Sequence, residues 1–290
     1  MNNQFITSVN FHVWEPCNMH CKFCFATFQD IKQTILPKGH LAREYALEVV
    51  KMLSQYGFEK ISFAGGEPTL CPWLPELIEL AKDLGMTTMI ITNGSNLTDR
   101  FLKINHEKLD WIGISIDSLS SESNLKIGRA ISGSRALCLD DYKSIVNKVK
   151  TNGYGLKINT VVNSMNFEED MTDFINYAQP KRWKILQALP ISGQNDSKID
   201  DMVVNELQFQ SFVKNHERLK RVTNIVVETN SMIKASYAMV DPAGRFFDNV
   251  EGIHNYSKPI LGSGVEIAIK EVNYDFEKFI LRGGKYNWIK

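Results

Sequence analysis

Three cysteines near the amino terminus have the spacing of a metal-binding loop. Three residues separate Cys17 from Cys21 and two separate Cys21 from Cys24, so one short loop can turn all three thiolates toward one site. Thiolates are soft ligands that suit iron–sulfur clusters and zinc. Because four protein thiolates would close such a site, a loop that supplies three leaves one metal position open to a small molecule.

Two other interpretations of these cysteines remain open. One is a structural zinc site, although no fourth clustered cysteine or well-spaced histidine pair follows the loop. The other is three unrelated thiols, although three of the five cysteines fall within eight residues. We interpret the remaining two, Cys71 and Cys138, as ordinary thiols.

Strands and helices alternate along most of the chain. The hydrophobic pattern predicts strands over residues 5–14, 60–64, 86–92, 109–116, 154–162, 183–189 and 222–227. It predicts helices over residues 41–55, 73–84, 140–152, 163–178 and 206–220. A hairpin is expected over 236–248, and 261–290 is a mixed tail. Such alternation favours a mostly parallel sheet, and roughly six units would form a partial (β/α)6 barrel.

Polar and glycine-rich segments follow several of these strands. The cysteine loop follows the first strand, Gly65-Gly66-Glu67-Pro68 follows the second, and Asn93 follows the third. Glycines let the backbone approach a ligand closely, and Glu67 can accept a hydrogen bond from an ammonium group. By itself Gly-Gly-Glu-Pro is also a common turn sequence. The carboxyl ends of parallel strands are where α/β folds place their chemistry.

Composition limits the class of protein. A chain of 290 residues can bury a large core, and 33 Lys plus Arg residues balance 33 Asp plus Glu residues. Nothing in this balance indicates a nucleic-acid partner. The sequence shows neither a signal peptide nor an apolar run of membrane-spanning length. Clustered cysteines favour a reducing compartment, so we expect a cytoplasmic protein that binds no membrane.

The cysteine spacing, followed by the aromatic Phe25, resembles the motif of the radical S-adenosylmethionine (SAM) superfamily. The resemblance implies a 4Fe-4S cluster held by Cys17, Cys21 and Cys24, whose unique iron chelates the amino and carboxylate groups of SAM. It implies that the glycine-rich segment receives the amino group of SAM and that other residues lie near its ribose and carboxylate. The cofactor-binding residues would be Gly65, Gly66, Glu67, Asn93, Ser115, Asp117 and Arg129.

Segments further along the chain resemble viperin, a radical SAM family that dehydrates nucleoside triphosphates. The similar segments are 10–12, 17–25, 59–68, 157–159, 166–171, 182–184, 236–237 and 282–288, in order from about residue 8 to the end. The resemblance is to a form of the family without the N-terminal membrane helix of the animal proteins, so we expect no such helix here. The resemblance implies one α/β domain, with 1–235 forming the partial barrel and 236–290 forming a C-terminal extension that packs on the barrel and covers the nucleotide site.

Basic residues in the predicted strands indicate an anionic ligand. Buried lysines are rare unless paired, and no acidic residue lies near Lys157 or Lys184 in either strand. Each could instead be a lysine at the rim. The resemblance implies that Tyr237 is catalytic and relays hydrogen or a proton, whereas from the sequence alone it is equally a half-buried hairpin aromatic. The substrate-binding residues would be Lys60, Lys157, Asn159, Arg182, Lys184 and Lys285, with Gly283 and Gly284 letting the tail close as a lid.

The resemblance also implies a reaction. Reductive cleavage of SAM would give a 5′-deoxyadenosyl radical that removes hydrogen from C4′ of CTP, UTP or GTP. The 3′-hydroxyl would then leave as water, and one electron and one proton would complete a 3′-deoxy-3′,4′-didehydro chain terminator with an antiviral role. Flavodoxin or ferredoxin would donate electrons. The alternatives are another radical SAM reaction on a phosphorylated small molecule, or a non-catalytic Fe–S or zinc scaffold.

The cysteine assignment can be tested one residue at a time. We expect Cys17→Ala, Cys21→Ala and Cys24→Ala each to abolish cluster binding and SAM cleavage, because two thiolates cannot hold a cluster of four irons. Iron content and 5′-deoxyadenosine formation after anaerobic reconstitution are the measurements. Cys71→Ala and Cys138→Ala are the controls and should keep both. Full activity in any of the first three variants would refute the assignment.

Overall fold

The structure is a computed structural model that describes residues 5–288. Its centre is a ten-stranded sheet with the order β12-β11-β10-β1-β2-β3-β4-β7-β8-β9. The strands are β1 (Ser8–Trp14), β2 (Lys60–Gly65), β3 (Thr87–Thr92), β4 (Trp111–Ser115), β7 (Gly155–Val162), β8 (Arg182–Gln187), β9 (Asn224–Glu228), β10 (Ala238–Val240), β11 (Arg245–Asp248) and β12 (Asn255–Pro259). A separate two-stranded ribbon pairs β5 (Ala130–Ile131) with β6 (Arg135–Ala136).

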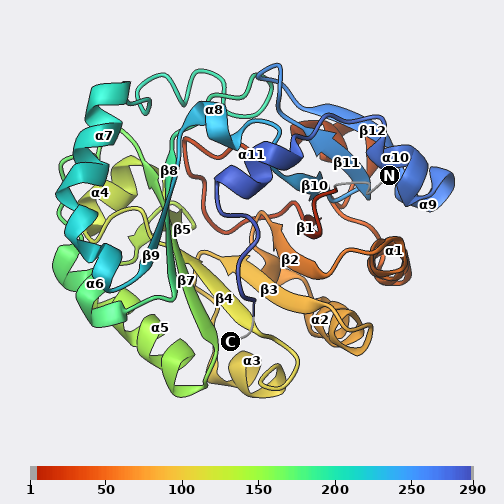
Figure 1. The fold of residues 1–290 in the computed structure, drawn as a ribbon, viewed down its shortest axis with the longest axis horizontal. Helices are drawn as coiled ribbons and strands as arrows, with labels where there is room; N and C mark the ends of the chain where they lie inside the picture. Colours follow the sequence, from red (N-terminus) through yellow and green to blue (C-terminus); the bar gives the residue numbers. More distant parts are fainter. Residues whose placement is uncertain (1–4, 289–290) are drawn as a thin grey trace.

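Most helices lie around the outside of the curved sheet, as Figure 1 shows for α1, α2, α3, α5 and α6. The helices are α1 (Arg43–Tyr56), α2 (Leu74–Asp83), α3 (Asp99–Ile104), α4 (Ser121–Lys126), α5 (Leu139–Thr151), α6 (Thr172–Ala178), α7 (Glu206–Asn215), α8 (Asn230–Ile233), α9 (Ile260–Ser263), α10 (Val265–Ile269) and α11 (Phe276–Leu281). Single turns of other helix types cover Ile31–Ile35, Pro68–Leu70 and Glu217–Arg221. No helix within residues 5–288 has both the length and the apolar character needed to cross a bilayer.

The predicted parallel α/β architecture is confirmed. All neighbours from β1 to β9 pair in parallel, and each crossover between them carries at least one helix or turn. The predicted hairpin is also present, because β10 and β11 pair antiparallel. The C-terminal segment does more than pack on the barrel, however. β10 pairs in parallel with β1, so β10, β11 and β12 extend the same sheet.

One predicted helix begins much later than expected. The sequence pattern favoured a helix over 163–178, but residues 164–168 form turns and α6 begins only at Thr172. The side chain of Asn163 accepts a hydrogen bond from Met165 N, and that of Asn166 accepts one from Asn163 N. Asparagine side chains that bond local main-chain amides compete with helix formation. The predicted helix over 206–220 likewise ends as α7 at Asn215 and continues as a short 3₁₀ turn.

Alternation along the strands separates an apolar outer face from a polar inner face. Ile61, Phe63, Ile158, Trp183 and Ile185 are fully buried in the core between sheet and helices. Burying such side chains stabilises the fold by about 1.5–3 kcal/mol each. The residues between them point the other way, and on β2, β7 and β8 these are Lys60, Ser62, Lys157, Asn159, Arg182 and Lys184. The inner face of the barrel is therefore polar and basic.

The glycine pair after β2 permits a close approach of two loops. A Cβ on Gly65 would lie 2.3 Å from Trp14 O, and one on Gly66 would lie 2.1 Å from Glu15 O. Main-chain hydrogen bonds from Gly66 N to Trp14 O and from Glu67 N to Pro16 O hold the loops together. These contacts lie directly before Cys17, so the glycines shape the start of the cysteine loop.

Because the space beside Gly66 is occupied by main chain, Gly66→Ala should displace the cysteine loop and destabilise the fold by about 1–3 kcal/mol. Denaturant unfolding before reconstitution measures the free energy, and iron content afterwards measures the loop. Gly262→Ala in α9 is the matched control, because a Cβ there would have no neighbour within 4 Å. Equal stability and equal iron content in the two variants would contradict the structural role.

Candidate active site

The cysteine loop is attached along one side to the segment that follows α4. His20 N and Lys22 N donate to the carbonyl oxygens of Gly128 (3.1 Å) and Ile127 (2.9 Å). Gly128 has φ +78°, and a Cβ there would lie 2.2 Å from His20 O, so glycine is needed for this pairing. The loop is thus fixed by protein contacts at the carboxyl end of β1.

The three clustered thiols are partly buried, and none forms a disulfide. Burial, together with the charges of the neighbouring thiolates, raises the pKa of Cys17 to about 12 and that of Cys21 to about 11. Three thiolates in this loop therefore need nearby positive charge, which an iron cluster supplies. Within residues 5–288 no three His, Cys, Asp or Glu side chains are placed to hold a single metal ion. A 4Fe-4S cluster differs because each thiolate binds its own iron, so the donor set fits a cluster.

Glu67 is completely buried and joins the second loop to the end of β3. Its carboxylate accepts hydrogen bonds from Thr69 N (3.1 Å), Thr69 Oγ1 (2.6 Å), Thr92 Oγ1 (2.7 Å) and Asn93 N (2.8 Å). Three of these donors bind Oε1 and only Asn93 N binds Oε2. Because each carboxylate oxygen offers about two acceptor positions, Oε2 keeps one for an ammonium group. The predicted role of Glu67 stays a prediction, and the structure adds a supporting role for its side chain.

Two further predicted cofactor residues pack against the cysteine loop. Asn93 Nδ2 donates to Asn18 Oδ1 at 2.8 Å, and Asn18 Nδ2 donates to Ser95 Oγ at 2.9 Å. Arg129 is buried and lies close enough to Cys21 to lower the pKa of that thiol against the effect of burial. Both residues therefore lie beside the proposed cluster ligands.

The remaining two cofactor residues hold Arg129 in place. The Arg129 guanidinium forms a buried ion pair with Asp117 and donates to Ser115 O at 3.4 Å. Asp117 also accepts a hydrogen bond from Val161 N at 2.8 Å, which ties it to β7. The structure thus brings the predicted cofactor residues together around the cysteine loop, at the carboxyl ends of β1 to β4.

Four predicted substrate residues form a buried basic cluster on the inner face. Lys60, Lys157, Arg182 and Lys184 are 3–6% exposed. Lys157 pairs in register with Arg182, and Asn159 with Lys184, so these side chains lie side by side on β7 and β8. Burial lowers the pKa of Lys60 and of Lys157 well below 10.5, and neighbouring cations lower both further. Asn159 Oδ1 is buried without a hydrogen-bond partner in the part of the chain that the structure describes.

Two charged residues of this cluster, Glu228 and Arg282, were not among the site residues predicted from the sequence. Glu228, on β9, is completely buried, and its Oε1 lies 2.6 Å from Lys184 Nζ and 3.6 Å from Arg282 Nη1. Burial alone would raise the pKa of Glu228, but the adjacent Lys184 and Arg282 lower it to about 2. The expectation that Lys184 has no acidic partner nearby is wrong, because β9 pairs beside β8 and brings Glu228 across.

Tyr237 lies at the centre of the same contacts. Its hydroxyl donates to Glu228 Oε2 and accepts from Lys184 Nζ. The guanidinium carbon of Arg282 lies 3.7 Å from the ring centroid. Burial raises the pKa of the phenol well above 10. Tyr237 is therefore neutral, and its O–H group is held in one direction inside the barrel. An aromatic residue that only packed in a hairpin would not need these polar contacts.

The C-terminal tail differs from the sequence expectation. Lys285, predicted as a substrate contact, is exposed, and its neighbours in the chain turn inward instead. Three hydrogen bonds hold the tail. Gly283 O accepts one from Arg182 Nη2 (2.5 Å), and Tyr286 Oη accepts one from Lys60 Nζ (2.5 Å). Trp288 O accepts the third from Trp111 Nε1 (2.7 Å).

These contacts place the tail at the amino ends of β2, β4 and β8, opposite the cysteine loop. Figure 1 shows it running from α11 between β8 and β2 toward the start of β4. The turn after α11 explains this course, because Gly283 has φ +66° and a Cβ on Gly284 would lie 2.3 Å from the Phe279 ring.

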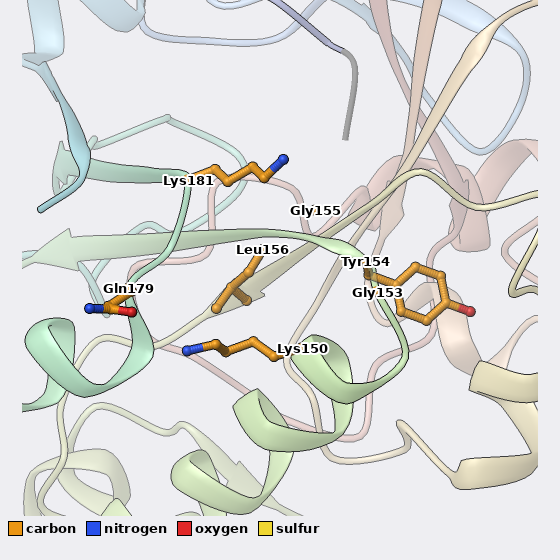
Figure 2. A pocket seen from close by; sticks show the side chains of 7 residues that line it. All are labelled: Lys150, Gly153, Tyr154, Gly155, Leu156, Gln179 and Lys181. Atoms are coloured by element: carbon orange, nitrogen blue, oxygen red, sulfur yellow. The ribbon is translucent and has the colours of Figure 1, made fainter.

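A small surface cavity of about 240 Å³ lies away from these residues. Figure 2 shows its lining, with Lys150 on α5 and Lys181 just before β8. None of its seven lining residues belongs to the predicted site. The inner face of the barrel is instead filled by the basic side chains and the tail.

Comparison with known proteins identifies the class. The profile described as "Radical SAM superfamily" matches residues 13–178. The fold resembles SuiB of Streptococcus suis bound to S-adenosylmethionine, with a TM-score of 0.64 and 15% identity over 84% of this chain and 60% of that chain. It also resembles anSMEcpe with bound AdoMet, with a TM-score of 0.62 and 17% identity over 83% and 73%. A parallel partial barrel with this cysteine loop defines a radical SAM protein.

Sequence relatives narrow the family. A protein of Lacinutrix mariniflava is 60% identical over 98% of this chain, and one of Flammeovirga pacifica is 52% identical over 99%. Both are named S-adenosylmethionine-dependent nucleotide dehydratase, and the protein RSAD2 of Danio rerio with the same name is 36% identical over 98%. The chain spans 59%, 97% and 79% of their lengths. It belongs to the family of S-adenosylmethionine-dependent nucleotide dehydratases, the viperin family.

The buried basic cluster predicts a pH-dependent stability. Because burial lowers the pKa of Lys157, the folded protein binds fewer protons than the unfolded chain between that lowered pKa and 10.5, so stability rises with pH across this window. Lys157→Met should stabilise the nucleotide-free protein and flatten this rise, as measured by denaturant unfolding between about pH 7 and 9.5. Lys103→Met, at an exposed position of α3, should leave the slope unchanged. Parallel curves for wild type and Lys157→Met would contradict the prediction.

Proposed function

We propose that this protein is a lyase that removes water from the ribose of a nucleoside triphosphate to give the 3′-deoxy-3′,4′-didehydro nucleotide. The observation that carries the proposal is the buried basic cluster inside the barrel, on the same inner face that leads to the cysteine loop. In the described part of the chain, five buried cations there (Lys60, Lys157, Arg182, Lys184 and Arg282) face one carboxylate. A triphosphate carries about four negative charges, so it would neutralise the excess.

The residues around the cysteine loop fit the cofactors that radical SAM proteins use. Cys17, Cys21 and Cys24 would hold the 4Fe-4S cluster, and the loops after β2, β3 and β4 would hold SAM beside it. When bound, these cofactors supply a carbon radical by one-electron cleavage of SAM. The electron would come from a small redox protein such as flavodoxin or ferredoxin.

The protein's own contribution is binding and orientation. Lys60, Lys157 and Arg182 would hold the phosphates, which places the ribose between them and the cysteine loop. Tyr237 faces the same space and would give or relay the hydrogen or proton that completes the product. The tail contacts at the other end exclude water from the phosphate side. A product without a 3′-hydroxyl would terminate nucleic acid synthesis, which is the basis for an antiviral role.

Anaerobic incubation with SAM, dithionite and each of the four NTPs tests the reaction. We expect 5′-deoxyadenosine and a nucleotide product lighter by one water, detected by mass spectrometry. Loss of water from no NTP, with SAM still cleaved, would favour a different phosphorylated substrate. The same assay identifies which of CTP, UTP and GTP is used.

The basic cluster can be tested by its effect on KM. Lys157→Ala and Arg182→Ala should each raise the KM for the nucleotide about tenfold or more, because a charge-assisted contact contributes about 1.5–3 kcal/mol. SAM cleavage without nucleotide should survive, and Lys103→Ala should behave as wild type. If nucleoside monophosphates and diphosphates react as well as triphosphates, the cluster is not a triphosphate site.

A further inference from the structure

Glu228 separates the buried cations into two groups. We propose that Glu228 is a positioning residue: it assigns Lys184 and Arg282 to Tyr237 and leaves Lys60, Lys157 and Arg182 to bind the phosphates. This inference rests on the proposed function, because it divides one site into a phosphate part and a tyrosine part. It also changes the role of Lys184 from a substrate contact to a partner of the tyrosine.

Lys184 is held by two protein groups, Glu228 and Tyr237. Its Nζ lies 2.6 Å from Glu228 Oε1, donates to the Tyr237 hydroxyl, and lies 4.7 Å from the centroid of the Tyr237 ring. An ammonium group has three donors, and two are directed at these partners. Glu228 offsets the charge of Lys184 in a position that is only 5% exposed.

Arg282 is held in the same way from the other side. Its Nε and Nη2 donate to Ser236 O at 2.9 and 2.7 Å, and its Nη1 faces Glu228 at 3.6 Å. The guanidinium lies on the ring of Tyr237 at 3.7 Å. Two guanidinium donors are therefore bound to Ser236 O, and Nη1 faces Glu228, so these contacts fix Arg282 against the ring of Tyr237.

The other three cations lack a carboxylate partner within residues 5–288. Lys60 donates to the neutral hydroxyl of Tyr286. Arg182 donates to the carbonyl oxygens of Gly283 at 2.5 Å and Arg282 at 3.4 Å. Lys157 is buried beside both, and no hydrogen bond from its ammonium group is found there. Among the residues that the structure describes, Lys60 and Lys157 lack a carboxylate to hold their charge, and a bound anion would favour their protonated forms, so this group is the one suited to the phosphates.

The consequence for Tyr237 is a fixed O–H direction. Its hydrogen points at Glu228, and its oxygen accepts from Lys184. Removing the negative charge would leave two unbalanced cations against the phenol and no charged acceptor for its hydrogen. The reaction should then lose its tyrosine step while phosphate binding remains.

Glu228→Gln tests this division because it keeps the shape and removes the charge. Tripolyphosphate binding, measured by calorimetry, should stay within about threefold of wild type or tighten. In the turnover assay kcat should fall about tenfold or more, with little change in KM, and the ratio of 5′-deoxyadenosine to product should rise. Lys157→Ala should give the opposite pattern, with weak tripolyphosphate binding and a raised KM.

A matched control and a second variant keep the test decisive. Asp110→Asn removes another buried carboxylate paired with a lysine, Lys82, on the outer face, and should change neither parameter. If Glu228→Gln does not fold, Lys184→Gln breaks the same contact from the other side and must give the same fall in kcat without a rise in KM. A tenfold loss of tripolyphosphate binding, or an unchanged kcat, in either folded variant overturns the proposal. Wild type that binds tripolyphosphate but dehydrates no NTP would refute the proposed function alone.

Discussion

Within residues 5–288, the burial of five basic side chains against a single carboxylate is the constraint on which the inner site depends. An unpaired lysine in a barrel loses hydration that the protein must replace, and the lowered pKa values of Lys60 and Lys157 express that cost. The apolar outer faces of the same strands offset it, because Ile158, Trp183 and Ile185 alternate with the inner cations and are completely buried. A stable shell thus holds an inner charge that only an anion can balance. This is how a binding site is kept ready before its ligand arrives.

The two ends of the parallel strands carry different parts of the site. The cysteine loop and its supports lie at the carboxyl ends, and the tail closes the amino ends through Tyr286 and Trp288. Along β7, Lys157 lies five residues before Val162, which corresponds to roughly 16 Å in a strand. That length separates the cations proposed to bind phosphates from the loop that would carry the cofactors. The tail therefore acts as the floor of the barrel in this arrangement, where the sequence suggested a lid.

Local patterns in the sequence were sufficient for much of the fold and for part of the site. Cysteine spacing and strand–helix alternation are properties of short segments, as is the alternation that puts Lys157 and Asn159 on one face. Contacts between segments that are distant along the chain could not be predicted from the sequence. Glu228 reaches Lys184 only because β9 lies beside β8. The predicted start of α6 was also wrong, because the side chains of Asn163 and Asn166 bind main-chain amides that a helix would otherwise use. Lys285 was predicted to bind a phosphate because of its positive charge. The turn at Gly283 and Gly284 leaves Lys285 exposed and directs Tyr286 inward.

The segment after β2 shows why a motif can be recognised before its physical role is known. Gly65-Gly66-Glu67 resembles a cofactor-binding segment, yet its most direct contacts are within the protein. The glycines make room for the main chain of Trp14 and Glu15. The Glu67 carboxylate accepts three hydrogen bonds on Oε1 and one on Oε2, from its own loop and from the end of β3. The motif thus sets the position of Cys17 relative to the ends of β2 and β3. Glu67 Oε1 holds the loops together, whereas within residues 5–288 Oε2 accepts only from Asn93 N and keeps an acceptor position for the ammonium group predicted from the resemblance. The same three residues can then build the cluster loop and contact the cofactor, through different atoms.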